Sequence, residues 1–377
     1  MRKTLAVARK ELRQIRRDPL TLAMLLGVPA MMLLLYGYAL NFDVRHVALA
    51  VEDRDRSASS RELIAAFVQS TYFDLVGDLG AGESPEELFR RNRARAVLVV
   101  PEGYAEMLGS GRTASIQLLV DGTDSNTAGT VLGYAESLVQ ERNVALLAAT
   151  WTRQRPEPLP MAIDYRPRVW FNPELKSTQF LVPGLVGFIL MLTAVISTAL
   201  SVVREKERGT LEQLRITPLR AEQLLLGKTL PYLVISLIAT AIILIVARGL
   251  FGVEVQGSYL DLFLATLVYL LGALGFGLLI SSVAPNQAMA FQAGAVGSML
   301  PAIFLSGFIF PLRNMPDALR VVSYAVPARY YLVILRGVIL KGAPLTAYPD
   351  QAGFLLLYAV AVSALAWVRL TRREAEA

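Results

Sequence analysis

The sequence predicts a membrane α-helical bundle of six transmembrane helices with an inserted extracytoplasmic α/β domain. Three observations lead to this fold class. Apolar residues make up 54% of the 377 residues, and the mean hydropathy of +0.47 exceeds that of ordinary soluble domains. Charged residues, only 18% of the chain, cluster between long apolar runs. One long segment after the first apolar run is acidic and loses the membrane-type pattern.

Residues 1–19 are predicted to form a cytoplasmic amphipathic helix. Basic residues cover most of its surface, and apolar residues recur on one helical face, at Leu5, Ala8, Leu12 and Ile15. Such a helix lies flat on the inner leaflet before the chain turns into the membrane at Asp18-Pro19. The alternative is a basic anchor without an ordered helix.

A helix needs about 20 apolar residues to cross a hydrocarbon layer of about 30 Å. Six stretches meet this length, at residues 20–42, 180–203, 229–249, 259–283, 288–310 and 351–368. Transmembrane helix 1 is therefore assigned to residues 20–42, and helices 2–6 lie within residues 179–377. The apolar run 330–340 is excluded, because each basic residue beside it costs about 2.5 to 3.5 kcal/mol at membrane depth. Residues 311–342 are predicted to form an outer re-entrant region.

The direction of the spans follows from the basic residues near their ends. They precede the first span at Arg2, Lys3, Arg9, Lys10, Arg13, Arg16 and Arg17, and lie between the second and third at Arg204, Lys206, Arg208, Arg215, Arg220 and Lys228. Both termini are therefore expected in the cytoplasm. A cleaved signal peptide ending near Ala48-Leu49-Ala50 is the disfavoured alternative, because the apolar run is too long.

Residues 43–178 are expected outside the membrane. They hold 15 Lys/Arg and 19 Asp/Glu, a net charge of −4. Because the whole chain has a net charge of +6, the residues outside this segment carry +10. Because the positive excess lies beside apolar spans, it indicates topology and not a nucleic-acid partner.

Strands and helices alternate in this segment, which indicates an α/β domain. Short apolar runs predict strands at residues 47–51, 96–100 and 116–120. Capping residues predict helices starting near Ser57 and Ser84, and a longer helix runs from about Ser125 to Trp151. The sequence Asp121-Gly122-Thr123-Asp124 is interpreted as a strand-to-helix turn, because no EF-hand spacing follows.

Catalytic and metal-binding motifs are not found in the sequence. There is no cysteine, and the single histidine, His46, lacks partners for a metal site. Gly227-Lys228-Thr229 has the form of the end of a phosphate loop, but Glu222 occupies the place of its first glycine. The chain is therefore not expected to be an enzyme or to bind a cofactor.

Polar and small residues within the predicted spans have two interpretations each. Thr193, Ser197, Ser201 and Gln292 line a transport route or, as we prefer, hydrogen-bond between helices. Close helix approach, between two copies of the chain or within one, is predicted at Gly272, Ala273, Gly277, Ala290, Gly294 and Ser298. The six predicted span cores hold no ionisable residue, whereas ion-coupled secondary transporters need one.

Residues 204–218 are predicted to form a compact charged hairpin at the inner membrane surface. Thr210 and Gln213 have capping-box spacing, Gly209 permits the turn before them, and Pro218 limits the short helix. Such a hairpin is a plausible dock for a soluble partner; the alternative is a solvated basic loop.

The segment Glu207 to Leu214 resembles the E-R-G-T-L-E-x-L hairpin of type 2 ABC transporter permeases, followed by that family's Thr-Pro at Thr217-Pro218. A second block, residues 323–331 with Arg336-Gly337 and Lys341-Gly342, resembles the outer re-entrant region between the family's last two spans. The order of the elements also matches the exporter subgroup with a large periplasmic domain between the first two spans.

The resemblance implies the permease subunit of an ATP-driven exporter. Its ATPase-coupling residues are then Glu205, Glu207, Arg208, Gly209, Thr210, Leu211, Glu212, Gln213 and Leu214. The implied partners are a separate ATP-binding subunit that holds the ATP, a second permease copy or paralogue forming a homodimer or heterodimer, and membrane lipid. A periplasmic adaptor protein is a further candidate partner. The rival interpretations are an ion-coupled secondary transporter and a membrane receptor that senses through its outer domain.

Overall fold

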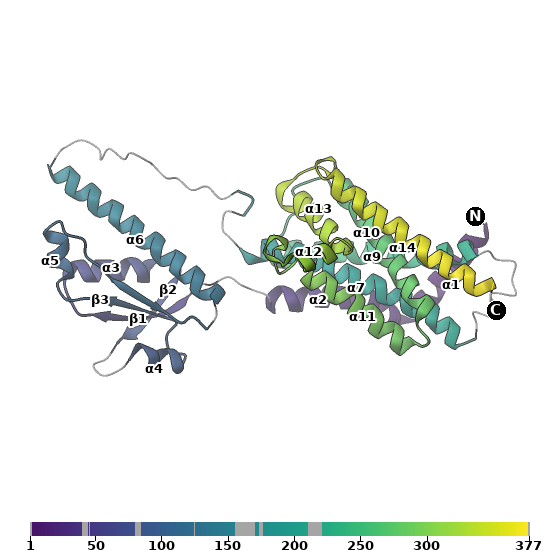
Figure 1. Ribbon diagram of the computed structural model, residues 1–377, viewed down its shortest axis with the longest axis horizontal. Helices are drawn as coiled ribbons and strands as arrows, with labels where there is room; N and C mark the ends of the chain where they lie inside the picture. The colour runs from purple at the N-terminus through teal and green to yellow at the C-terminus, as the bar shows by residue number, and fades with distance from the viewer. Residues whose placement is uncertain are drawn as a thin grey trace. The chain divides into compact units, whose positions relative to one another are not determined.

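A computed structural model of the chain describes residues 2–39, 44, 46–79, 84–123, 125–154, 170–172, 176–209 and 221–375. The chain forms two compact units (Figure 1). One comprises residues 42–167, and the other comprises residues 1–41 and 168–377.

The second unit is helical throughout its described part. Its helices are α1 (Arg2–Arg17), α2 (Pro19–Ala39), α7 (Ser177–Glu207), α9 (Ala221–Phe251), α10 (Tyr259–Val283), α11 (Gln287–Phe304), α12 (Asp317–Ser323), α13 (Pro327–Lys341) and α14 (Pro349–Ala375). Among the described residues, five helices contain a stretch long and apolar enough to cross a membrane: α2, α7, α9, α10 and α14.

Helix α7 is the central helix of this unit. It packs against α2, α9, α10, α11 and α13. In its apolar stretch 78% of the residues are buried, against 17% in α2 and 22% in α14. Because α2 and α14 leave most of their apolar side chains exposed, their outer faces are suited to contact lipid.

Helices α7, α10 and α13 are joined by a buried tyrosine pair. The rings of Tyr269 and Tyr331 are stacked with centroids 4.0 Å apart. The Tyr269 hydroxyl donates to the carbonyl of Gly187 at 2.8 Å, and that of Tyr331 shares a hydrogen bond of 2.9 Å with Thr266. Each buried hydroxyl is thus satisfied, as the low dielectric of the interior requires.

The predicted fifth span, residues 288–310, is not confirmed, because the helix at this position, α11, is not among the five helices above and ends before the predicted limit. Helix α11 ends at Phe304, and Gly307 adopts the left-handed conformation with φ of 80°. The guanidinium of Arg336 donates to the carbonyls of Gly307 at 2.9 Å and Phe308 at 3.2 Å. Since non-helical backbone at membrane depth must be satisfied by protein groups, Arg336 supplies the donors that this break requires.

Helices α12 and α13 meet at a bend of 80°. If the two are one broken span, the pair adds a sixth crossing to the five helices above. The bend suits a broken span and a re-entrant loop alike, so the re-entrant assignment of residues 311–342 stays a prediction.

The small residues of α10 and α11 are used for packing within the chain. A Cβ atom on Gly277 would lie 2.5 Å from the Val195 carbonyl oxygen, and one on Gly272 would lie 3.0 Å from Tyr358. Gly294 faces Ile196 of α7. These positions therefore bring α10 and α11 close to α7 and α14. Of the two predicted uses of the small residues, this is packing within one chain.

The unit of residues 42–167 is an α/β fold. A four-stranded sheet has the order β2-β1-β3-β4, where β1 is parallel to β2 and β3, and β3 is antiparallel to β4. The strands are β1 (Val47–Asp53), β2 (Phe73–Asp78), β3 (Ala96–Val100) and β4 (Gln117–Val120). Its helices are α3 (Ala58–Gln69), α4 (Pro85–Arg90), α5 (Tyr104–Gly109) and α6 (Ser125–Gln154).

Three of these strands confirm the predicted ones, and β2 was missed. The apolar residues of β2 are interrupted by Asp74 and followed by Gly77, and only Phe73 is buried, so the strand gives a weaker sequence signal than the others. The predicted helix starts are confirmed by capping bonds: the Ser57 and Ser84 side chains accept from the backbone N–H of Ser60 and Glu87. Asp121 accepts two hydrogen bonds from Thr123, as a turn there requires.

Candidate functional site

The predicted coupling residues begin in the last turn of α7. Glu205 and Glu207 belong to that helix, Arg208 caps it, and Gly209 adopts the left-handed conformation with φ of 67°. That conformation favours glycine, and it turns the chain out of the helix. The rest of the predicted hairpin, including Thr210, Leu211, Glu212, Gln213 and Leu214, lies outside the described residues.

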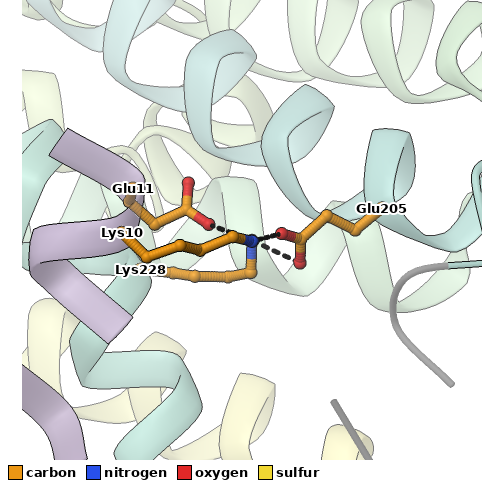
Figure 2. Close-up of polar contacts among 4 residues, drawn as sticks. All are labelled: Lys10, Glu11, Glu205 and Lys228. Carbon is orange, nitrogen blue, oxygen red and sulfur yellow. Dashed lines mark hydrogen bonds and ion pairs between the residues drawn. The ribbon is translucent and has the colours of Figure 1, made fainter. Parts of the chain in front are cut away.

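Glu205 belongs to a buried cluster of four charges, and Figure 2 shows the ammonium groups of Lys10 and Lys228 between the carboxylates of Glu11 and Glu205. Lys228 Nζ lies 2.7 Å from Glu205 Oε2 and 3.0 Å from Glu11 Oε1. Lys10 Nζ lies 2.5 Å from Glu205 Oε1 and 3.5 Å from Glu11 Oε1. Two ammonium groups balance two carboxylates, so the four-residue cluster has no net charge.

Three of these four side chains are almost completely shielded from solvent. Lys228 is 2% exposed, Glu11 4% and Glu205 8%, whereas Lys10 is 46% exposed. Burial alone would lower the pKa of Lys10, but the hydrogen bond to Glu205 and the two nearby carboxylates outweigh it. The pKa of Lys10 therefore lies above its ordinary value of 10.5, and its ammonium group stays charged.

The cluster depends on the close approach of α1 to α9. A Cβ atom on Gly227 would lie 2.6 Å from Val7 Cβ and 3.0 Å from the Thr4 carbonyl oxygen. Only glycine permits this separation, and the next residue along α9 is Lys228. The Gly-Lys pair that has the form of the end of a phosphate loop is thus a helix-packing contact followed by a buried ion pair.

The last turn of α7 is also fixed on a second side. Glu207 Oε1 accepts from the backbone N–H of Gln287 at 2.8 Å, and Glu207 pairs with the Gln287 side chain as well. Lys206 donates to the carbonyl of Ala284 at 3.3 Å. Polar contacts at the start of the predicted hairpin therefore connect α7 to α1, to α9 and to the turn between α10 and α11.

Sequence reasoning missed the partners of Glu205. The predicted apolar face of α1 contained Leu5 and Leu12, but these are 62% and 48% exposed. The structure instead buries Val7, Ala8, Glu11 and Ile15, mainly against α9. One signal was available: Glu11 is the single acid in a strongly basic helix, four residues from both Val7 and Ile15.

Two cavities adjoin this cluster. An apolar cavity of about 390 Å³ is lined mainly by α2 and α7, with Tyr232 of α9 and Phe291 of α11. A polar cavity of about 320 Å³ is lined by the charged ends of α1 and α7. Ser201, Arg204 and Tyr232 line both.

Interhelical hydrogen bonds were the preferred interpretation of the polar residues along α7, and this interpretation is wrong for two of them. Thr193 donates to the Ile189 carbonyl at 2.7 Å and Ser197 to the Ala194 carbonyl at 3.0 Å, so both hydroxyls bond within their own helix. Both residues line the apolar cavity. Gln292 of α11 is exposed.

Metal binding finds no support in the described part of the chain, where no three His, Asp or Glu side chains gather. His46 is exposed and lies 3.1 Å from Asp74 in an ion-pair geometry. This placement agrees with the surface role expected for the single histidine.

Comparison with known proteins gives one family and a set of full-length relatives. The family model of the ABC-2 family transporter protein matches residues 19–368. The chain is 34% identical to the probable multidrug ABC transporter permease YbhS of Escherichia coli, over 99% of this chain and 97% of that protein. It is 30% identical to the probable multidrug ABC transporter permease YbhR of the same organism, over 97% of each.

A more distant relative comes from another bacterium. The linearmycin resistance permease protein LnrN of Bacillus subtilis is 22% identical over 95% of this chain and 97% of its own length. The family match spans residues of the helical unit, the α/β unit and the predicted coupling segment alike. The chain therefore belongs to the ABC-2 family of transporter proteins, as a multi-pass membrane permease subunit of an ABC exporter.

Proposed function

We propose that this permease moves lipophilic compounds of more than one kind out of a bacterial cell, across its inner membrane. The names of two relatives, YbhS and YbhR, describe probable multidrug permeases, and that of LnrN describes resistance to linearmycin. The apolar cavity, with Met24 and Phe291 half exposed at its wall, is consistent with ligands that arrive from lipid.

The energy comes from a separate ABC ATP-binding subunit, which holds the ATP and docks on the hairpin of residues 204–218. The observation that carries this proposal is the charge cluster around Glu205. Because Lys10 and Lys228 hold the base of the hairpin to α1 and α9, a push on the hairpin displaces several helices together. A solvated loop without such anchors would move alone.

The docking step is tested by Leu211→Asp and Leu214→Asp in the full permease, co-expressed with its ATP-binding subunit. A carboxylate on the apolar side of the predicted hairpin helix should abolish co-purification of that subunit, while membrane insertion persists. Leu319→Asp is the matched control, because Leu319 is a leucine of α12 that is 48% exposed. A stoichiometric complex that survives both hairpin substitutions would contradict the docking site.

The ion-coupled and receptor alternatives have their own readouts. Transport by the permease alone in liposomes, driven by a proton gradient, would support a secondary transporter. Ligand binding without any transport in the complete complex would support a receptor.

Two permease chains form the transport unit in this proposal. Two distinct E. coli permeases each match nearly the whole chain, which supports a pair of paralogues as well as a pair of identical chains. Copies with two different affinity tags, expressed together, should co-purify if the chain forms a homodimer. Co-purification only with a paralogue would assign a heterodimer.

The α/β unit is proposed to lie on the outer side of the inner membrane, where it offers a surface for a periplasmic adaptor, with both chain termini in the cytoplasm. The chain has no cysteine, so single cysteines report topology directly. Thr113→Cys, exposed in the α/β unit, should react with an impermeant maleimide in spheroplasts. Ala6→Cys, exposed on α1, should react only after lysis, and the reverse pattern would invert the topology.

A further inference from the structure

The two cavities beside the charge cluster meet at shared walls. Ser201, Arg204 and Tyr232 line both the apolar cavity of about 390 Å³ and the polar cavity of about 320 Å³. Arg204 and Ser201 lie three residues apart on α7, so the junction follows one helix. A single ligand that fills both spaces needs an alkyl part and a polar head.

The apolar cavity is built to take a chain. Its lining residues recur along one face of α7 and one face of α2. Those of α7 are Leu192, Thr193, Ile196, Ser197 and Leu200, and those of α2 are Met24, Leu25, Val28 and Met32. The hydroxyls of Thr193 and Ser197 are already bonded to their own helix and present no free donor to a ligand. Away from Arg204, a ligand in this cavity therefore needs no polar group.

The polar cavity determines the sign of the head group. Its carboxylates Glu11 and Glu205 are neutralised by Lys228 and Lys10, and Asp18 has an interaction of its own. Within the described part of the chain, the guanidinium groups of Arg204 and Arg208 have no ion pair or hydrogen bond. Two arginines one helical turn apart thus form a positive surface beside Glu11 and Glu205, which are already paired.

We propose that these joined cavities bind an anionic amphiphile, with its alkyl chain between α2 and α7 and a phosphate-type head group at Arg204 and Arg208. Arginine suits this head because its planar group binds two phosphate oxygens at once. The wall also offers the hydroxyls of Ser201 and Tyr232 near the same junction. The proposal concerns binding, so it can fail while the transport assignment stands, and the reverse also holds.

The test uses the full chain in phosphatidylcholine nanodiscs with a photoreactive probe, dodecyl phosphate carrying a diazirine near the end of its chain. After irradiation, labelled residues should map to the cavity faces of α2 and α7. Unlabelled dodecyl phosphate should remove this labelling, whereas equal concentrations of dodecylphosphocholine or of inorganic phosphate should not. Protection by inorganic phosphate alone would indicate a small-anion site and overturn the amphiphile proposal.

Two kinds of variant sharpen the result. Arg204→Gln and Arg208→Gln should weaken labelling about tenfold or more, which corresponds to about 1.4 kcal/mol. Arg248→Gln, an arginine of α9 paired with Glu254, is the matched control and should label like the unaltered protein. Thr193→Trp should fill the cavity and remove the label from α2 and α7.

Labelling spread evenly over α10 and α14, or insensitive to Arg204→Gln, would show ordinary lipid contact and overturn the site. No labelling in the cavity would show that another occupant, such as a second permease copy, covers it. If an arginine variant does not fold, judged by gel filtration, the competition pattern in the unaltered protein still decides.

Discussion

The two ends of α7 accommodate buried charge in different ways. Near Glu205, two acids and two lysines from three helices neutralise one another. Near Phe180, the single guanidinium of Arg336 stacks at 3.8 Å on the Phe180 ring and donates to backbone carbonyls. The first arrangement ties helices together through side chains, and the second stabilises the broken end of α11. In these two places a buried charge is stabilised either by opposite charges or by backbone carbonyls that lack a helical donor.

The largest expected effect comes from Lys228→Met. It leaves the Glu11 and Glu205 carboxylates buried with only the half-exposed Lys10, so stability should fall by about 3 to 5 kcal/mol. Thermal unfolding of the purified permease measures the loss. Lys341→Met, at an exposed lysine of α13, is the control. Equal unfolding temperatures for the two variants would contradict the cluster.

A smaller effect is expected for Arg336→Leu. The Gly307 and Phe308 carbonyls lose their donors, but only Phe308 is buried, so the total loss should be about 1 to 3 kcal/mol. Arg336→Lys should recover part of the loss, because an ammonium group can still donate to one of them. If Arg336→Leu and Arg336→Lys lowered the stability equally, the carbonyl contacts would not explain the contribution of Arg336 to stability.

The smallest effect is expected for Lys10→Met. Lys10 is 46% exposed, so solvent screening should hold its contribution below about 1 kcal/mol. Its pKa is raised above 10.5 in the folded chain, so this contribution is fully present below pH 10.5 and declines as the pH rises through the raised value.

The stability difference between Lys10→Met and the unaltered protein should therefore stay constant from about pH 6 to 9. It should shrink only above pH 10.5. Denaturation at a series of pH values measures this, and a difference that vanished near neutral pH would show that Lys10 is not held by Glu205.

Features set by local sequence could be predicted, and features set by distant contacts could not. Apolar runs predicted β1, β3 and β4, and span lengths predicted α2, α7, α9, α10 and α14. The end of α11 was missed because its break depends on Arg336, 29 residues further along the chain. Glu205 was named as a coupling residue from the family resemblance, and that role stays a prediction. Its partners Lys10 and Lys228 lie in other segments, and no local periodicity links them to it.

Helix α7 runs over 31 residues, from Ser177 to Glu207, a length of about 46 Å at 1.5 Å per residue. It therefore has the dimensions of a lever. A rotation of about 5° around its midpoint would carry each end about 2 Å, in opposite directions. A small tilt imposed at the charged end would thus be delivered at the far end, where the same helix meets the last turns before the break in α11.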